Sequence, residues 1–119
     1  MAEEKDLKVR TKLFALRIIR LYCSLPKTTK AQVIGKQVLR SGTSVGAHYR
    51  EAQRAKSDAD FINKIEGALQ ELDETAYWFE LLNESGILKE ERLTALHAEA
   101  EELIAIFVTV VKKVKQRSR

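Results

Sequence analysis

Carboxylates in the third quarter of the chain are the residues whose type and number most suggest chemistry. A di-iron or di-manganese centre in a helical bundle needs inward-facing Glu residues and two Glu-x-x-His pairs. The residues three positions before His48 and His97 are Val45 and Thr94, so neither pair exists. Most of the carboxylates also fall off the apolar seam of their segment: Glu66, Glu71, Asp73, Glu74 and Glu80. These residues predict a solvated acidic face, no metal centre and no cofactor.

Three further features suggest catalysis or phosphate binding, and none of them forms a complete motif. Cys23 has no base near it in sequence that could activate the thiol, so we expect a packed or idle side chain. The stretch 41–46 has hydroxyls and glycines, but it lacks the Gly-x-x-x-x-Gly-Lys-Ser/Thr pattern and the strand that should precede it. His48 lies on an apolar seam, where we expect a buried hydrogen bond rather than a ligand or a base. The sequence predicts no catalytic residues and no enzyme.

Length and composition narrow the class of protein. The chain has 119 residues, 21 Lys and Arg, 17 Asp and Glu, a net charge of +4 and one cysteine. This length suits one domain, residues 1–119, and a lone cysteine excludes the disulfide framework of small secreted domains. The start is polar and acidic, unlike a secretory signal, and no run of about eighteen uncharged apolar residues could span a membrane. We expect a cytoplasmic protein with no membrane partner.

Few residues break the chain, because it contains only five Gly and one Pro. Breaks are expected at Pro26, around residues 54–57 and at Gly86. Between the breaks, apolar residues recur three and four positions apart, and nothing alternates with the period of a strand. The pattern predicts an all-α, antiparallel up-down-up-down four-helix bundle, with helices over roughly 7–24, 29–54, 58–84 and 89–116.

Local features refine the prediction of helices. Ser57 followed by Asp60 resembles a capping box at a helix start, and Gly86 suits the left-handed position after a helix end. Gly42 and Gly46 argue against a helix, since an interior glycine costs about 1 kcal/mol relative to alanine. The apolar seam nevertheless keeps its phase through this stretch. We therefore predict one continuous helix with a thin face against which a neighbouring backbone packs closely.

The first and last helices carry more apolar surface than one bundle needs. A bundle helix that faces water needs one apolar stripe, and a second stripe is typical of a contact with another protein. The simplest partner is a second copy, so we predict a homo-oligomer with an interface at Val9, Leu13, Leu16, Ile104, Val108 and Val111. The alternative is a broad core edge covered by the aliphatic stems of Arg10, Arg17 and Arg20.

Charge is distributed unevenly along the chain. Residues 7–24 contain five basic residues and no acid, whereas residues 58–84 contain eight acids and one lysine. In an antiparallel bundle the start of the first helix, the second turn and the end of the last helix share one end of a rod. Basic residues outnumber acids there, and such a surface suits phosphate backbones. The nucleic-acid-binding residues predicted on this basis are Lys5, Lys8, Arg10, Lys12, Arg50, Arg54, Lys56, Lys112, Lys113 and Lys115.

Two alternatives to nucleic-acid binding stay open. Lys and Arg at helix C-termini also complement the helix dipole and aid solubility, without any ligand. The bundle could instead be a purely structural adaptor whose partner is another protein. The sequence does not decide between RNA and DNA, and it contains no recognisable motif for reading bases.

Two stretches of the sequence resemble a known family. LRSGTSVGAHYREA, from Leu39 to Ala52, resembles the helix-two signature of the bacterial four-helix-bundle family called ribosomal-RNA intervening-sequence proteins. SDADFINKIEGALQELDET, from Ser57 to Thr75, is similar to that family's helix-three signature. Relatives include accessory proteins of diversity-generating retroelements, which form five-membered rings and present a basic surface to nucleic acid and a reverse transcriptase. The resemblance, which extends over roughly residues 7–114, implies a pentamer.

The motif positions of that family carry over to this chain residue by residue. The resemblance implies that they hold the second and third helices together, with Arg40 paired to an acid. His48 departs from the pattern, because the family commonly has Asn there. The matching positions are Arg40, Ser41, Ser44, Glu51, Asp60, Phe61, Glu71 and Leu72.

Overall fold

The computed structural model describes the backbone of residues 2–118 and the side chains of residues 7–118. It has no strand between residues 2 and 118, which confirms the all-α prediction. The helices are α1 (Ala2–Cys23), α2 (Thr29–Gln53), α3 (Asp58–Glu84), a short 3-10 helix η1 (Glu90–Arg92) and α4 (Thr94–Arg117). None of the helices in this range combines the length and apolar character that crossing a bilayer requires.

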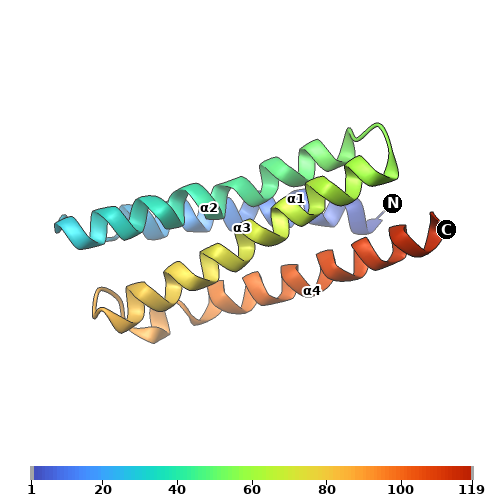
Figure 1. Ribbon diagram of the computed structural model, residues 1–119. Coiled ribbons are helices and arrows are strands. Elements are labelled where there is room, and N and C mark those ends of the chain that lie inside the picture. Colours follow the sequence, from blue (N-terminus) through green and yellow to red (C-terminus); the bar gives the residue numbers. More distant parts are fainter. Residues whose placement is uncertain (1, 119) are drawn as a thin grey trace.

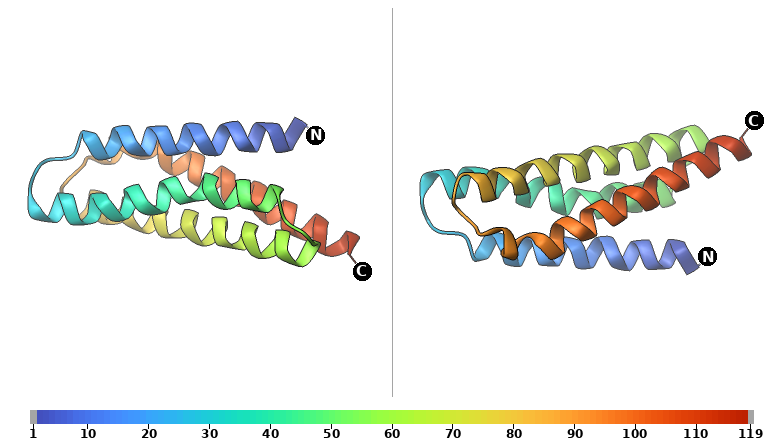
Figure 2. Two further views of the ribbon diagram at one scale, coloured as in Figure 1. Left: turned by 90° about the horizontal axis from the view of Figure 1, so that it is seen from above. Right: turned by 90° about the horizontal axis from the view of Figure 1, so that it is seen from below.

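The four long helices form an antiparallel rod that measures 50 × 21 × 21 Å. Both termini and the α2–α3 turn lie at one end of the rod, and the other two connections lie at the opposite end (Figure 1). Helix α2 packs on α3, α1 packs on α2, and α4 packs on α3. Helix α4 starts beside α1 and diverges from it toward the termini (Figure 2). The predicted bundle is confirmed, with α1 and α4 as its least packed neighbouring pair.

The ends of the helices follow from local chemistry. The Ser57 hydroxyl accepts a hydrogen bond from the Asp60 backbone N–H at 3.0 Å, which caps α3 as predicted. Gly86 follows α3 with φ of 79°, the left-handed conformation expected for it. Helix α4 begins at Thr94 rather than near residue 89, because Lys89 is extended and the next three residues form η1.

Glycines bring α1 and α2 close together, as the continuous-helix prediction required. Helix α2 runs unbroken through residues 41–46. A Cβ atom placed on Gly42 would lie 2.7 Å from Cγ1 of Ile18, a side chain that is fully buried in the core. The missing Cβ at Gly42 therefore sets how closely the two helices approach.

Polar contacts join α2 to α3. The hydroxyls of Ser41 and Thr75 are hydrogen-bonded to each other at 2.7 Å inside the core. The Arg40 guanidinium donates to Glu71 at 3.5 Å and also to Glu74, which confirms that Arg40 is paired to acids. Trp78 Nε1 donates to the same Glu74 carboxylate at 2.9 Å. Most of these residues belong to the stretches that carry the family resemblance.

The prediction that His48 makes a buried hydrogen bond is wrong for one of its two ring nitrogens. His48 Nδ1 is buried and has no hydrogen-bond partner among the described residues. The ring lies against α3 at Gly67, where an added Cβ would be 2.9 Å from Nδ1. The seam position correctly placed the side chain between helices, but the neighbouring position is a glycine that offers the ring space and no side-chain polar atom.

The close approach of Gly42 and Ile18 predicts the effect of adding one methyl group. Gly42→Ala should destabilise the fold by about 1–2 kcal/mol, because overpacking of a core costs more than the improved helix propensity returns. Urea unfolding at one fixed protein concentration, followed by circular dichroism, measures the difference.

Gly46→Ala is the matched control, since its Cβ would meet nothing closer than Thr11 Oγ1 at 3.3 Å. It lies one turn further along the same helix and gains the same propensity. A Gly42→Ala protein that is as stable as the Gly46→Ala protein would contradict the close contact with Ile18.

Candidate nucleic-acid interface

The antiparallel fold brings the end of α2, the α2–α3 turn and the end of α4, all of which carry basic residues, to one end of the rod (Figure 1). Arg50 lies in the last turn of α2, Arg54 and Lys56 lie in the α2–α3 turn, and Lys112 and Lys113 lie near the end of α4. We call these five residues the basic end. All five are exposed. The start of α3 and the end of α4 meet directly, because Arg117 Nη2 lies 3.3 Å from Asp58 Oδ1.

Three of the described acidic residues at this end contact groups outside the basic end, and a fourth, Asp60, accepts a hydrogen bond from the Lys56 backbone N–H at 3.4 Å. Glu51 pairs with Lys64 at 3.4 Å, and Glu66 lies 3.9 Å from Lys115. The Ser118 hydroxyl donates to Asp58 and Arg117 lies beside it, so the pKa of the Asp58 carboxyl falls below its usual value. Among residues 7–118 no carboxylate pairs with a side chain of the basic end.

Arg10 is bound inside the subunit, unlike the basic end. Its guanidinium donates to Glu99 at 2.7 Å and lies 3.1 Å from Glu102, which ties α1 to α4. The hydrogen bond to Glu99 raises the pKa of Arg10 further above its high ordinary value. Arg10 is therefore removed from the predicted nucleic-acid set, because its side of α1 faces acidic residues of α4.

The remaining predicted basic residues are divided between two places. Lys8 and Lys12 are exposed on α1, and Lys12 is about half-way along that helix rather than at its end. The side chain of Lys5 lies outside the described side chains. Lys115, close to Glu66, belongs to the α3–α4 contact. Because α1 and α4 diverge toward the termini, the α1 lysines are set apart from the end of α4 (Figure 2).

The predicted apolar interface also divides into two parts. Val9, Leu13 and Leu16 are 55%, 51% and 41% exposed and form a stripe along α1, which we call the α1 stripe. Val111 is buried at 7% exposure, so it belongs to the core and not to an outer stripe. Ile104 is half-buried against the core, and Val108 is 37% exposed.

The two parts of the predicted apolar interface lie on different flanks of the rod. The α1 stripe adjoins Arg10, which faces α4. Val108 lies seven residues, about two turns, before Lys115, which reaches Glu66 of α3, so Val108 is on the α3 side of α4. Three further exposed apolar side chains were not part of the predicted interface: Ile19 of α1, Val33 of α2 and Tyr77 of α3, which is 52% exposed. The feature of the sequence that could have indicated Tyr77 is an aromatic residue at a position outside the core-facing seam of α3.

Other candidate chemistry is not brought together. No group of three or more His, Cys, Asp or Glu side chains within residues 7–118 is arranged to hold a metal ion. Cys23 is a free cysteine and exposed rather than packed. The hydroxyls of Thr43 and Ser44 bond to carbonyl oxygens of their own helix instead of forming a phosphate cradle.

Comparisons with known proteins give a consistent result. The chain is similar to a protein of unknown function from the S23 ribosomal protein family of Bacteroides thetaiotaomicron, with 40% identity and a TM-score of 0.86. The match covers 92% of this chain and 97% of that one. A comparison with curated proteins finds no match. The family model described as 23S rRNA-intervening sequence protein matches residues 4–109, which is most of the bundle. The chain therefore belongs to the 23S rRNA-intervening sequence protein family.

Proposed function

We propose that the protein is non-catalytic and binds the phosphate backbone of RNA or DNA through its basic end. The observation that carries this proposal is a group of five exposed basic side chains without a carboxylate partner in the described chain. Positive side chains of this kind attract a polyanion, because their binding releases the counterions that are condensed on the nucleic acid. The description of the family names 23S rRNA, so RNA is the first polyanion to test.

Binding through phosphate contacts does not depend on the base sequence of the nucleic acid. Reading bases needs hydrogen-bonding groups in a groove or aromatic rings on which bases stack. Tyr49 is buried against Phe107 in the core, and Trp78 is half-buried and donates to Glu74. Tyr77 is exposed, but it lies well inside α3, away from the basic end. The proposed contacts are therefore with phosphates alone.

We also propose that the protein is a homo-oligomer that self-associates through the α1 stripe. Three large apolar side chains exposed along one helix are a surface that a partner would cover. Several copies in a ring would add their basic ends together and strengthen the attraction of a polyanion. The family resemblance implies five subunits.

The α1 stripe also supports a second candidate function. If its partner is another protein rather than a copy of this chain, the bundle is a structural adaptor. The two candidates differ in one respect, because an adaptor needs no affinity for nucleic acid at physiological salt.

Charge reversal at the basic end tests the nucleic-acid proposal. Arg50→Glu, Arg54→Glu and Lys56→Glu together should weaken binding of a mixed-sequence single-stranded RNA by at least about tenfold at low salt. The slope of log affinity against log salt should become shallower by about 2, roughly 0.7 for each phosphate that is no longer neutralised. Fluorescence anisotropy over a salt series measures both quantities.

A matched control makes the same change of charge elsewhere. Lys27→Glu, Lys36→Glu and Lys89→Glu alter three exposed lysines near the opposite end of the rod (Figure 1). This variant should keep most of the affinity and the salt slope. Equal reductions of affinity in the two variants would show that only net charge matters and would remove the basic end as a binding site.

A charge placed in the α1 stripe tests self-association. Leu13→Asp should shift the protein toward monomers, because a buried unpaired carboxylate disfavours the subunit contact. Size-exclusion chromatography with light scattering reports the mass. Val33→Asp is the control, since Val33 is similarly exposed at 58% but lies on α2 outside the stripe. If Leu13→Asp leaves the mass unchanged, the stripe is not the contact.

A further inference from the structure

Two clefts of similar size lie on either side of the start of α4. The basic cleft, of about 280 Å³, lies between α1 and α4 and carries Arg17, Arg20 and Arg92 over a floor that includes Leu21 and Leu96. The acidic cleft, of about 290 Å³, lies between α3 and α4 and carries Glu80, Glu84 and Glu90. No acidic residue lines the first cleft, and no Lys or Arg lines the second.

Arg17 of the basic cleft lacks the carboxylate partners that Arg10, on the same face of α1, has. Arg17 lies seven residues, about two turns, after Arg10, so the two side chains share a face. Arg10 meets Glu99 and Glu102 of α4, but Arg17 lies across from Ala95 and Leu96. The positive charge of Arg17 therefore has no carboxylate within the described chain.

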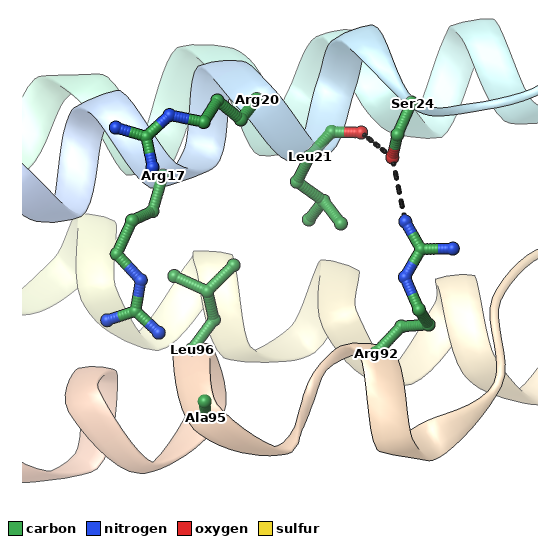
Figure 3. A pocket seen from close by; sticks show the side chains of 7 residues that line it. All are labelled: Arg17, Arg20, Leu21, Ser24, Arg92, Ala95 and Leu96. Carbon is green, nitrogen blue, oxygen red and sulfur yellow. Dashed lines mark hydrogen bonds between the residues drawn. The ribbon is translucent and has the colours of Figure 1, made fainter.

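The shape of the basic cleft leaves its centre open to a partner. Arg92 Nη2 donates to Ser24 Oγ at 3.2 Å, which holds Arg92 on one side. Arg17 extends toward Leu96 on the other side, and Leu21 lies between them (Figure 3). Arg20 extends along α1 toward Arg17 rather than toward α4, and it widens the positive rim (Figure 3). An acidic group that enters the cleft would therefore have guanidinium groups on both sides and an apolar floor beneath it.

Both clefts lie at the same height on the rod. Arg92, Ala95 and Leu96 line the basic cleft, whereas Leu93, Thr94 and His97 line the acidic one. These six residues are consecutive, so successive side chains from the end of η1 through the first turn of α4 divide between the two clefts. The clefts therefore lie at one level on the two sides of α4, one toward α1 and the other toward α3.

We propose that the basic cleft of one copy receives the acidic cleft rim of the next copy in a head-to-tail contact. This inference rests on the self-association proposed above and assigns its two surfaces. A contact between two unlike patches on different sides of the subunit is heterologous, and it repeats around a ring when the rotation closes. Rotation about an axis parallel to the rod keeps both clefts at their common height.

Apolar side chains lie next to each cleft and extend the same contact. Leu13 and Leu16 of the α1 stripe precede Arg17, and Tyr77 precedes Glu80 on α3. The ring contact thus joins apolar surface to apolar surface and base to acid. Exposed ion pairs add little affinity, but complementary charge fixes register and disfavours wrong partners. The contact should weaken as salt rises, because the charges face water before they meet.

Charge swapping tests this pairing in the full chain. Arg17→Glu with Arg92→Glu should reduce the mass measured by light scattering toward that of a monomer, and so should Glu80→Arg with Glu84→Arg. The chain that carries all four changes should recover the oligomer, since its clefts are again of opposite sign. Circular dichroism melts confirm that each variant is folded, and Arg17→Gln with Arg92→Gln replaces the first variant if it does not fold.

The outcomes separate the cleft pairing from the earlier proposals. Lys27→Glu with Lys36→Glu, an equal change of charge on exposed α2 and turn positions outside both clefts, should keep the oligomer. If the unaltered chain is an oligomer and the paired charge reversals leave its mass unchanged, the cleft pairing is wrong and self-association stands. A monomeric unaltered chain overturns both. A further outcome concerns inorganic phosphate. If phosphate stabilises the unaltered chain but not the Arg17→Glu, Arg92→Glu variant, and the two proteins have the same mass in solution, the basic cleft is an anion site and the pairing is wrong.

Discussion

Four antiparallel helices bury their apolar seams in one core, and the rest of the structure depends on this constraint. Ile18 of α1 fills the space left by Gly42 of α2, and Tyr49 packs on Phe107 across the core. Because consecutive helices run in opposite directions, segments far apart in the chain meet at one end of the rod. The basic end exists because of that alternation, and no local motif creates it.

Pairing of charges between the helices determines which charges are left for a partner. Arg10 is bound to Glu99 and Glu102, and Arg40 is bound to Glu71 and Glu74. These contacts join neighbouring helices, whereas the Arg and Glu side chains that line the two clefts and the side chains of the basic end have no oppositely charged partner among residues 7–118. Since exposed ion pairs add little stability, leaving these groups unpaired costs the fold little.

Local spacing was enough to predict most of the fold from the sequence. The helical period, the Ser57 cap and the left-handed Gly86 depend on residues close together in the chain, and all three are present. The continuity of α2 followed from the phase of its seam, although two glycines argued against it.

Relations between helices could not be predicted in the same way. The position of Arg10 against Glu99, the burial of Val111 and the glycine next to His48 depend on how helices are rotated against each other. A helical period shows which residues share a face, but not which neighbour that face meets. For the same reason no pattern in the sequence indicates that two clefts of opposite charge share the first turn of α4.

The affinity of the unaltered protein for single-stranded RNA, measured across a salt series, tests the central claim most directly. Contact with phosphates alone predicts a linear fall of log affinity with log salt, at a slope of about −0.7 for each phosphate neutralised. It also predicts similar affinities for RNAs of unrelated sequence. Absence of binding at about 50 mM salt, where such contacts are strong, would contradict a function based on the basic end.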